Sequence, residues 1–190
     1  MNWQALFDGL LAVVAFWVVL KPAQHLPAMR LACLLLGSAA VLGTLRFSGV
    51  LPLPPLHQFV SMLGAGVGLP LLAIAVVWPH SAVATERRFT WIFAVVAAVI
   101  CILLVLMVQF KLWTSICAIV SALGIVGSAL ARKRWPVLAA GLCILFALLA
   151  FAAQLRAGPL LPGEFLHIGL GLGLLLLGRS LAPALPHTAD

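Results

Sequence analysis

The sequence predicts an all-α integral membrane protein that crosses the bilayer seven times. Of its 190 residues, 65% are hydrophobic and only 8% are charged. A soluble domain has roughly 45–50% apolar and about 25% charged residues. This composition excludes a soluble enzyme, a disordered protein, a coiled coil and a nucleic-acid-binding module. The formal net charge of +7 is therefore interpreted as a signal of membrane topology rather than of an acidic partner.

Seven apolar stretches have the length that a membrane-spanning helix needs, which is about 20 residues at 1.5 Å each for roughly 30 Å of hydrocarbon. They are continuous rather than alternating, which favours helices over a β-barrel. The predicted segments are 3–20, 27–45, 55–78, 89–108, 112–131, 135–154 and 163–181. All connections are short, so residues 1–182 are expected to form a single transmembrane domain, with 183–190 as a short cytoplasmic tail.

The basic residues predict the orientation of the chain. One side of the membrane receives eight of them: Lys21, Arg30, Arg87, Arg88, Arg132, Lys133, Arg134 and Arg179. The other side receives Arg46, Lys111 and Arg156. Cytoplasmic loops carry an excess of Lys and Arg, so we expect the N-terminus outside and the C-terminus inside. The bias is typical of a bacterial inner membrane.

Small residues predict where helices approach one another. Gly64 and Gly68 in the third segment, and Gly169 and Gly173 in the seventh, are each four residues apart. This small-xxx-small spacing lets helix backbones come close in a lipid environment. Pro70 is expected to kink the third helix.

The cysteines do not suggest a disulfide. They fall on four different predicted helices at hydrocarbon depth, and none belongs to a CxxC pair: Cys33, Cys101, Cys117 and Cys143. We expect them to behave as small buried hydrophobic residues.

Polar residues gather at the predicted outer ends of the helices. They are Gln4, Asp8, Thr44, Arg46, His57, Gln58, Ser61, Gln109, Lys111, Thr114, Ser115, Gln154, Arg156, Glu164 and His167. An ionisable group costs about 2.5–3.5 kcal/mol at the centre of a membrane helix, and less near the interface. Asp8, about two turns inside the first helix, therefore needs a partner or a wet cavity. Arg46 is the expected partner in a structural ion pair.

Two histidines mark a candidate metal site. His57 and His167 lie near the starts of the third and seventh helices, and Glu164 shares the face of His167. If these helices pack through their glycines, two imidazoles and a carboxylate converge, with Asp8 as a fourth group. Such a set suits Zn²⁺ or another divalent ion. The alternative is structural: Glu164 is favoured in a first helical turn by the helix dipole alone, and the histidines face the headgroups.

The same residues include candidates for catalysis. Asp8 and Glu164 are the candidate acid–base groups, and Ser61 lies one turn after His57 on the same face. A metal ion held by the histidines would lower the pKa of a bound water for attack. The first functional hypothesis is therefore a metal-dependent hydrolase of a lipid or amphiphile at the outer leaflet.

Two other functions fit the sequence. A non-catalytic membrane component, such as an assembly subunit, a sensor or a small carrier, agrees with the short loops and glycine-rich faces. It would contact membrane lipids and either form a homo-oligomer or join a partner membrane subunit. A b-type haem protein with His57 and His167 as its axial ligands is the third hypothesis.

The sequence also resembles a known superfamily. The helix count, the orientation and the polar residues near the third and seventh helices resemble the seven-helix membrane hydrolases that include alkaline ceramidases and adiponectin-receptor-like proteins. The stretch Leu161-Pro162-Gly163-Glu164-Phe165-Leu166-His167 is also similar to the last helix of uncharacterised small bacterial multi-pass membrane proteins. The superfamily implies zinc held by three histidines and hydrolysis of lipid amides. Only His57 and His167 match, and Gly171 stands where a further histidine is expected.

Overall fold

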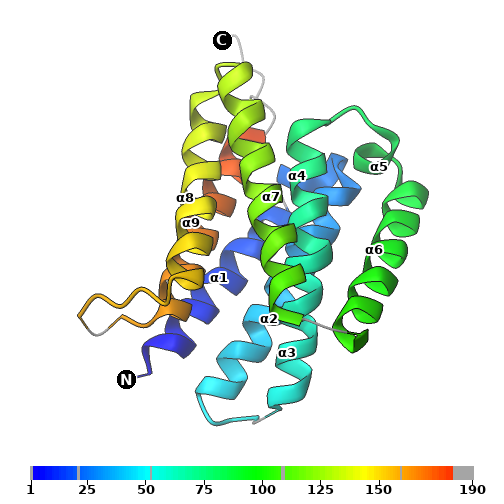
Figure 1. Cartoon of the computed structure of the whole chain (residues 1–190). Helices are drawn as coiled ribbons and strands as arrows, with labels where there is room; N and C mark the ends of the chain where they lie inside the picture. The colour runs from blue at the N-terminus through cyan, green and yellow to red at the C-terminus, as the bar shows by residue number, and fades with distance from the viewer. Residues whose placement is uncertain (1, 21, 52, 108–109, 159, 182–190) are drawn as a thin grey trace.

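The computed structural model describes residues 2–20, 22–51, 53–107, 110–158 and 160–181, and in these ranges the chain is a bundle of helices (Figure 1). The helices are α1 (Trp3–Leu20), α2 (Pro27–Phe47), α3 (Pro54–Leu63), α4 (Leu69–Val77), α5 (Ala82–Thr85), α6 (Arg87–Met107), α7 (Phe110–Ala131), α8 (Trp135–Ala152) and α9 (Pro162–Leu181). Seven spans in the described residues are long and apolar enough to cross a membrane. The predicted seven-helix, all-α fold is confirmed. The predicted tail, 183–190, lies outside the described residues.

The predicted segments agree closely with the observed spans. The first coincides with α1, and the others differ from their helices by a few residues at the ends. The short helix α5, which follows α4 at the turn into α6, is not predicted by hydropathy because it is too short to cross a bilayer. Its N-cap is Ser81, whose side-chain oxygen accepts a hydrogen bond from the backbone N–H of Ala84 at 3.3 Å.

The third span is irregular. A π-helical turn (Gly64–Gly68) joins α3 to α4 and ends two residues before Pro70. Proline has no N–H to donate to the preceding turn, and π-helical turns are one of the few known causes of irregularity in long helices. The disturbance expected at Pro70 therefore begins one turn earlier, in the glycine-rich stretch.

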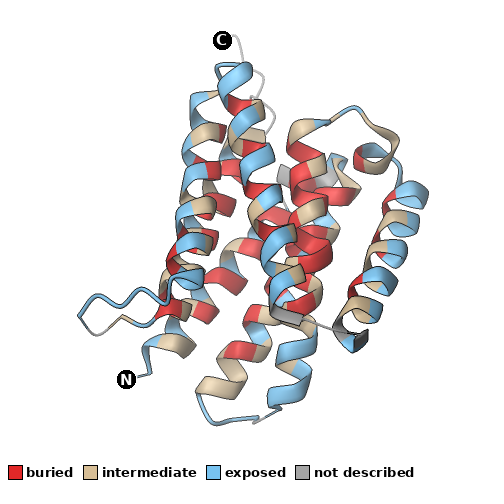
Figure 2. Cartoon of the chain, viewed as in Figure 1, coloured by how far each residue is buried: buried red, intermediate tan, exposed pale blue. Residues whose placement is uncertain are grey.

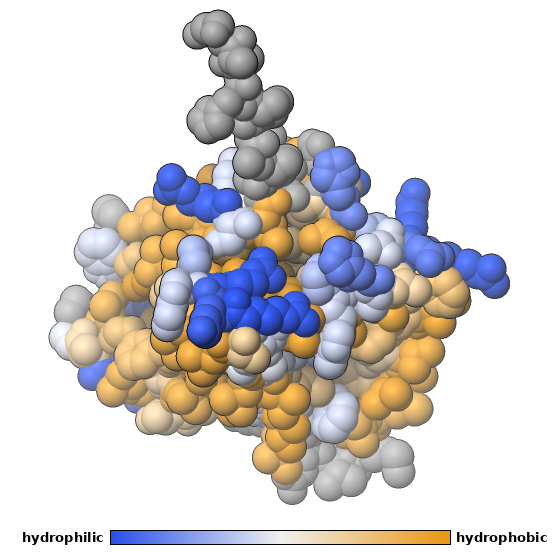
Figure 3. Space-filling model, turned by 90° about the horizontal axis from the view of Figure 1, so that it is seen from above, coloured by the Kyte–Doolittle hydropathy of each residue, from blue (hydrophilic) through white to orange (hydrophobic). Residues whose placement is uncertain are grey.

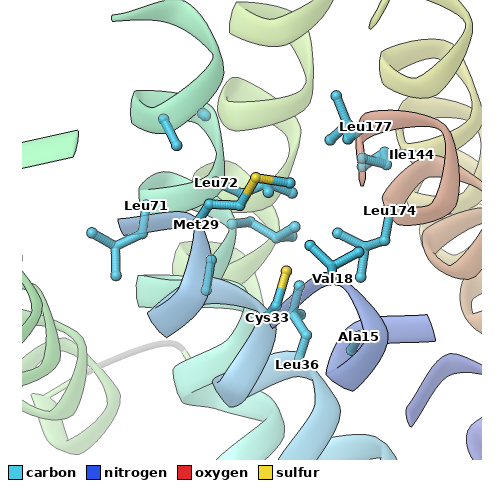
Figure 4. Close-up of a cluster of buried hydrophobic side chains, with 14 of the residues drawn as sticks. Ala15, Val18, Met29, Cys33, Leu36, Leu71, Leu72, Ile144, Leu174 and Leu177 are labelled. Carbon is cyan, nitrogen blue, oxygen red and sulfur yellow. The ribbon is translucent and has the colours of Figure 1, made fainter. Parts of the chain in front are cut away.

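The core lies where α1, α2, α4, α8 and α9 meet, and Figure 4 shows its side chains converging there. The labelled residues are Ala15, Val18, Met29, Cys33, Leu36, Leu71, Leu72, Ile144, Leu174 and Leu177. All are buried. Lipid tails are as apolar as these side chains, so close van der Waals packing rather than exclusion of water holds the helices together. The four cysteines in the described residues are free thiols.

The glycines allow close packing, but not between the helices that the sequence suggested. A Cβ added at Gly169 would lie 2.8 Å from the backbone oxygen of Cys143, and one added at Gly173 would lie 3.1 Å from that of Ala140. Both contacts are with α8. Gly64 faces α2 instead. Each glycine pair therefore packs against a helix that is its neighbour in the chain, and does not join the third span to the seventh.

Helix α6 stands apart from the rest of the bundle (Figures 1 and 2). Only 17% of its apolar span (Arg87–Leu104) is buried, against 61% of the third span (Pro54–Val77). Figure 2 shows the contrast: α4 is mostly buried, and α6 is exposed along most of its length. The surface of α6 is therefore largely left to lipid.

The two ends of the bundle differ in chemistry. The N-terminal end holds the starts of α1, α3 and α9 and the end of α2. The opposite end, here called the basic end, holds Arg30, Arg87, Arg88, Arg132, Lys133, Arg134 and Arg179. Figure 3 views this end and shows hydrophilic side chains over its middle and at its edge, with apolar side chains between them. The segregation agrees with the charge pattern from which the orientation was predicted.

Candidate functional site

The N-terminal end is organised around Asp8, whose side chain is completely buried. Asp8 lies on α1, which packs against both α2 and α9. Its carboxylate presses on Gly43 of α2, where an added Cβ would collide with it. Because Gly43 has no side chain, α2 can approach α1 closely enough to cover the carboxylate.

His167 on α9 is the partner of Asp8. Its Nδ1 lies 2.8 Å from Oδ1 of Asp8, and its side chain is 19% exposed. The contact is electrostatic, because neither carboxylate oxygen nor Nδ1 has a hydrogen-bond partner of good geometry among the described residues. A carboxylate at this depth needs a polar partner, and the structure places the imidazole of His167 beside it.

Arg46 and His57 form a second polar pair, which joins α2 to α3. Nη1 of Arg46 lies 3.2 Å from Nδ1 of His57. The guanidinium also lies over the ring of Phe47, 5.1 Å from its centroid, and the Phe47 and His57 rings meet edge to face at 5.8 Å. Arginine only donates hydrogen bonds, so Nδ1 of His57 is the acceptor. This assigns the neutral tautomer with its proton on Nε2.

The partners of Asp8 and Arg46 differ from those that the sequence suggested. The expected direct pair of Asp8 with Arg46 is replaced by Asp8 with His167 and Arg46 with His57. Asp8 is fully buried, whereas Arg46 is half-buried near the end of α2. The long arginine side chain reaches toward the polar rim of the bundle, and the short carboxylate stays between the helices.

Glu164 has a structural role in α9. It is only 2% exposed, and its Oε2 accepts a hydrogen bond from the backbone N–H of Leu161 at 2.6 Å. A glutamate in the third helical position that reaches back to the N-cap residue forms half of a capping box. Its negative charge is also favoured near a helix N-terminus.

The predicted metal ligands are not assembled. The described residues contain no group of three or more His, Cys, Asp or Glu side chains that could hold a metal ion. Glu164 is bonded within its own helix instead of joining His57 and His167. The guanidinium of Arg46 beside His57 also repels a cation at that imidazole. The residues therefore do not fit the zinc site expected from the sequence.

Substitution of Glu164 separates its capping role from the effect of its negative charge. Glu164→Ala is expected to lower the unfolding free energy by about 1 kcal/mol, the usual cost of losing a helix cap. Glu164→Gln keeps an acceptor for the Leu161 N–H and is expected to retain most of that stability. Thermal unfolding of both variants in detergent checks this. Equal losses in the two variants would show that the carboxylate charge, not the cap, is required.

A cavity of about 320 Å³ opens beside these pairs. Its polar lining residues are Gln4, Arg46, His57, Gln58, Ser61 and His167, and most of the remaining lining is apolar. Leu36, which also lines it, lies ten residues before Arg46 on α2, about 15 Å along the helix axis. The cavity therefore joins a polar mouth at the N-terminal end to an apolar interior.

Two residues of the site are not candidates from the sequence. Gly43 makes room for Asp8, and Phe47 packs on both Arg46 and His57. The spacing in the sequence could have indicated Gly43, because it lies three residues before Arg46 and therefore near the same face of the helix. Phe47 gives no comparable signal, because an aromatic residue at the end of a membrane helix is common.

No family model, no curated protein and no solved structure matches the chain. The likeness to seven-helix hydrolases stays an expectation drawn from the sequence.

Proposed function

We propose that this integral membrane protein binds an amphiphilic molecule with an acidic headgroup in the cavity at its N-terminal end. The observation that carries the proposal is the cavity itself, in which an apolar interior leads to a mouth holding one guanidinium and two imidazoles. Its volume of about 320 Å³ falls within the range of small-molecule sites, roughly 300–1,000 Å³.

The polar mouth offers donors for an acidic group. The guanidinium of Arg46 has five N–H donors, and the contact with His57 occupies the one at Nη1 that faces that ring. The neutral tautomer of His57 leaves its Nε2–H as a further donor. Guanidinium and imidazole donors together suit a carboxylate or a phosphate.

The orientation of this site follows from the charge pattern. Cytoplasmic loops carry the excess of basic residues, so the basic end is proposed to face the cytoplasm of a bacterial inner membrane. The cavity then lies in the outer half of the bilayer, and its ligand comes from the outer leaflet or from outside the cell.

In the simplest case the protein binds the amphiphile and does not react with it, as a carrier, a sensor or a lipid-holding subunit would. Such binding needs no metal. A haem held by His57 and His167 is the remaining cofactor alternative, and the Soret band of the purified protein tests it.

A second candidate function, hydrolysis of the bound amphiphile, is favoured by the contact between Asp8 and His167. A buried carboxylate beside Nδ1 holds an imidazole in place, so that Nε2 of the neutral ring acts as a general base, and it stabilises the imidazolium that forms when Nε2 accepts a proton. Ser61 lines the same cavity as His167. In this version His167 takes a proton from the Ser61 hydroxyl or from a water, with no metal involved.

A fluorescent fatty acid and the corresponding fatty alcohol test the binding proposal. The purified full-length protein in detergent is expected to bind the acid about tenfold more tightly than the alcohol, because Arg46 forms an ion pair only with the ionised acid. Arg46→Gln removes this preference. Ala39→Phe fills the cavity and weakens binding of both probes, because Ala39 lines it. The control, Leu103→Phe, changes an exposed side chain on α6 and leaves binding unchanged.

Two outcomes decide between the alternatives. Equal binding by Ala39→Phe and Leu103→Phe would place the ligand elsewhere and contradict the proposal. Release of fatty acid from an ester probe by the unchanged protein, abolished by His167→Gln, would favour the hydrolase over the carrier or sensor.

A further inference from the structure

A separate cavity of about 240 Å³ lies near the basic end, between α2 and α6. Its lining includes Arg30 and Leu31 from α2 and Arg87, Thr90 and Trp91 from α6. The two arginines come from different helices, and both stand at the first turn or so of their helix. This cavity shares no lining residue with the cavity at the N-terminal end.

The two arginines of this cavity are available to a ligand. Within the part of the chain that the structure describes, neither side chain makes a hydrogen bond or an ion pair. Arg132, also at the basic end, is engaged, since it donates to the backbone oxygen of Val77 at 2.8 Å. The hydroxyl of Thr90 is engaged too, because it donates to the backbone oxygens of Val83 and Glu86. The unengaged polar groups facing this cavity are therefore cationic donors.

An apolar groove continues from this cavity into the bundle. A further cavity of about 170 Å³ shares Leu31 and Trp91 with the first and is also lined by Leu35, Val67 and Ala98. Its lining is almost entirely apolar. The pair of cavities thus places two guanidinium groups at one end of a single groove and a hydrocarbon surface along the rest.

The groove has a defined depth. It begins at Arg87, and its lining on α6 extends to Ala98. The eleven residues from Arg87 to Ala98 extend about 17 Å along α6. This is about half of the roughly 30 Å that the hydrocarbon core of a bilayer measures. The groove therefore matches the depth of one leaflet.

We propose that this groove binds an anionic phospholipid from the leaflet at the basic end. The phosphate lies between Arg30 and Arg87, and an acyl chain follows Leu31, Leu35 and Trp91. Charge complementarity selects the occupant, because basic cavities between transmembrane helices near the cytoplasmic face suit anionic headgroups. The site is independent of the amphiphile cavity and of its proposed function. A bound lipid would also hold the loosely packed α6 against the rest of the bundle.

The test measures lipid binding to the purified full-length protein in detergent. Phosphatidylglycerol is expected to bind about tenfold or more tightly than phosphatidylcholine of the same chain length, and to raise the melting temperature. Arg30→Gln combined with Arg87→Gln is expected to abolish this difference. The matched control, Arg88→Gln combined with Arg179→Gln, removes the same charge from exposed residues outside the cavity and is expected to retain it.

Two further measurements distinguish binding of a lipid from binding of a free anion, and replace the double variant if it does not fold. Inorganic phosphate is expected to give no stabilisation, because the hydrocarbon groove contributes to binding. If the double variant does not fold, phosphatidylglycerol with brominated chains is added to the unchanged protein. It is expected to quench a fluorescence component that Trp91→Phe removes. Equal affinity for both lipids, an unaltered response of the double variant, or stabilisation by phosphate alone would overturn the proposal.

Discussion

Gly169→Ala is expected to destabilise the bundle strongly. The new Cβ would lie 2.8 Å from the backbone oxygen of Cys143 and in collision with the side chain of Ala147. A backbone oxygen in a helix does not move aside, so α9 must separate from α8. Overpacking of this kind costs about 1–3 kcal/mol or more. His167 lies two residues earlier on α9, so the separation also moves its imidazole away from Asp8.

The same helix contains a matched control for this substitution. A Cβ added at Gly171 meets nothing within 4 Å. Gly171→Ala is therefore expected to leave stability unchanged or to raise it by up to about 1 kcal/mol, because alanine is the better helix former. Thermal unfolding of both variants in detergent makes the comparison. Similar melting temperatures for the two would show that α8 and α9 do not pack through Gly169.

His167→Leu is expected to have the second large effect. It removes the compensating partner of Asp8, whose carboxylate is completely buried. Breaking a buried pair on one side costs about 3–5 kcal/mol, because an uncompensated charge stays buried. The loss is expected to appear as a lower midpoint of denaturant unfolding at neutral pH.

A second substitution shows whether the buried charge causes the loss. Combining Asp8→Ala with His167→Leu removes both partners and is expected to recover much of the stability, because replacing a whole buried pair by apolar residues is often neutral. His80→Leu, at an exposed histidine, is the control and is expected to change little. A double variant less stable than His167→Leu alone would show that Asp8 has another essential partner.

The positions of the spans could be predicted because they depend on local sequence alone. Seven apolar stretches, separated by proline and charged residues, fix the helices to within a few residues. The same pattern placed Asp8, His57 and His167 at one end of the bundle, and the structure gathers them there. Ser61 also lines the shared cavity.

The pairing of side chains could not be predicted, because it depends on which helices are neighbours and how each is rotated. Arg46 was expected to meet Asp8 but meets His57. Glu164 shares a helix face with His167, yet its carboxylate reaches back to the start of its own helix. Helical spacing shows which residues share a face and does not show what that face contacts.

The π-helical turn (Gly64–Gly68) has a consequence for how the third span is aligned along its length. A π-helical turn accommodates roughly one residue more than an α-helical turn, and one residue corresponds to about 100° of rotation around the axis. Helix α3, which bears His57, is thereby rotated about the helix axis relative to α4, which packs in the core through Leu71 and Leu72. A continuous α-helix would place these residues at a different angle to one another. With the extra rotation, α4 keeps its buried face in the core while α3 turns His57 toward Arg46.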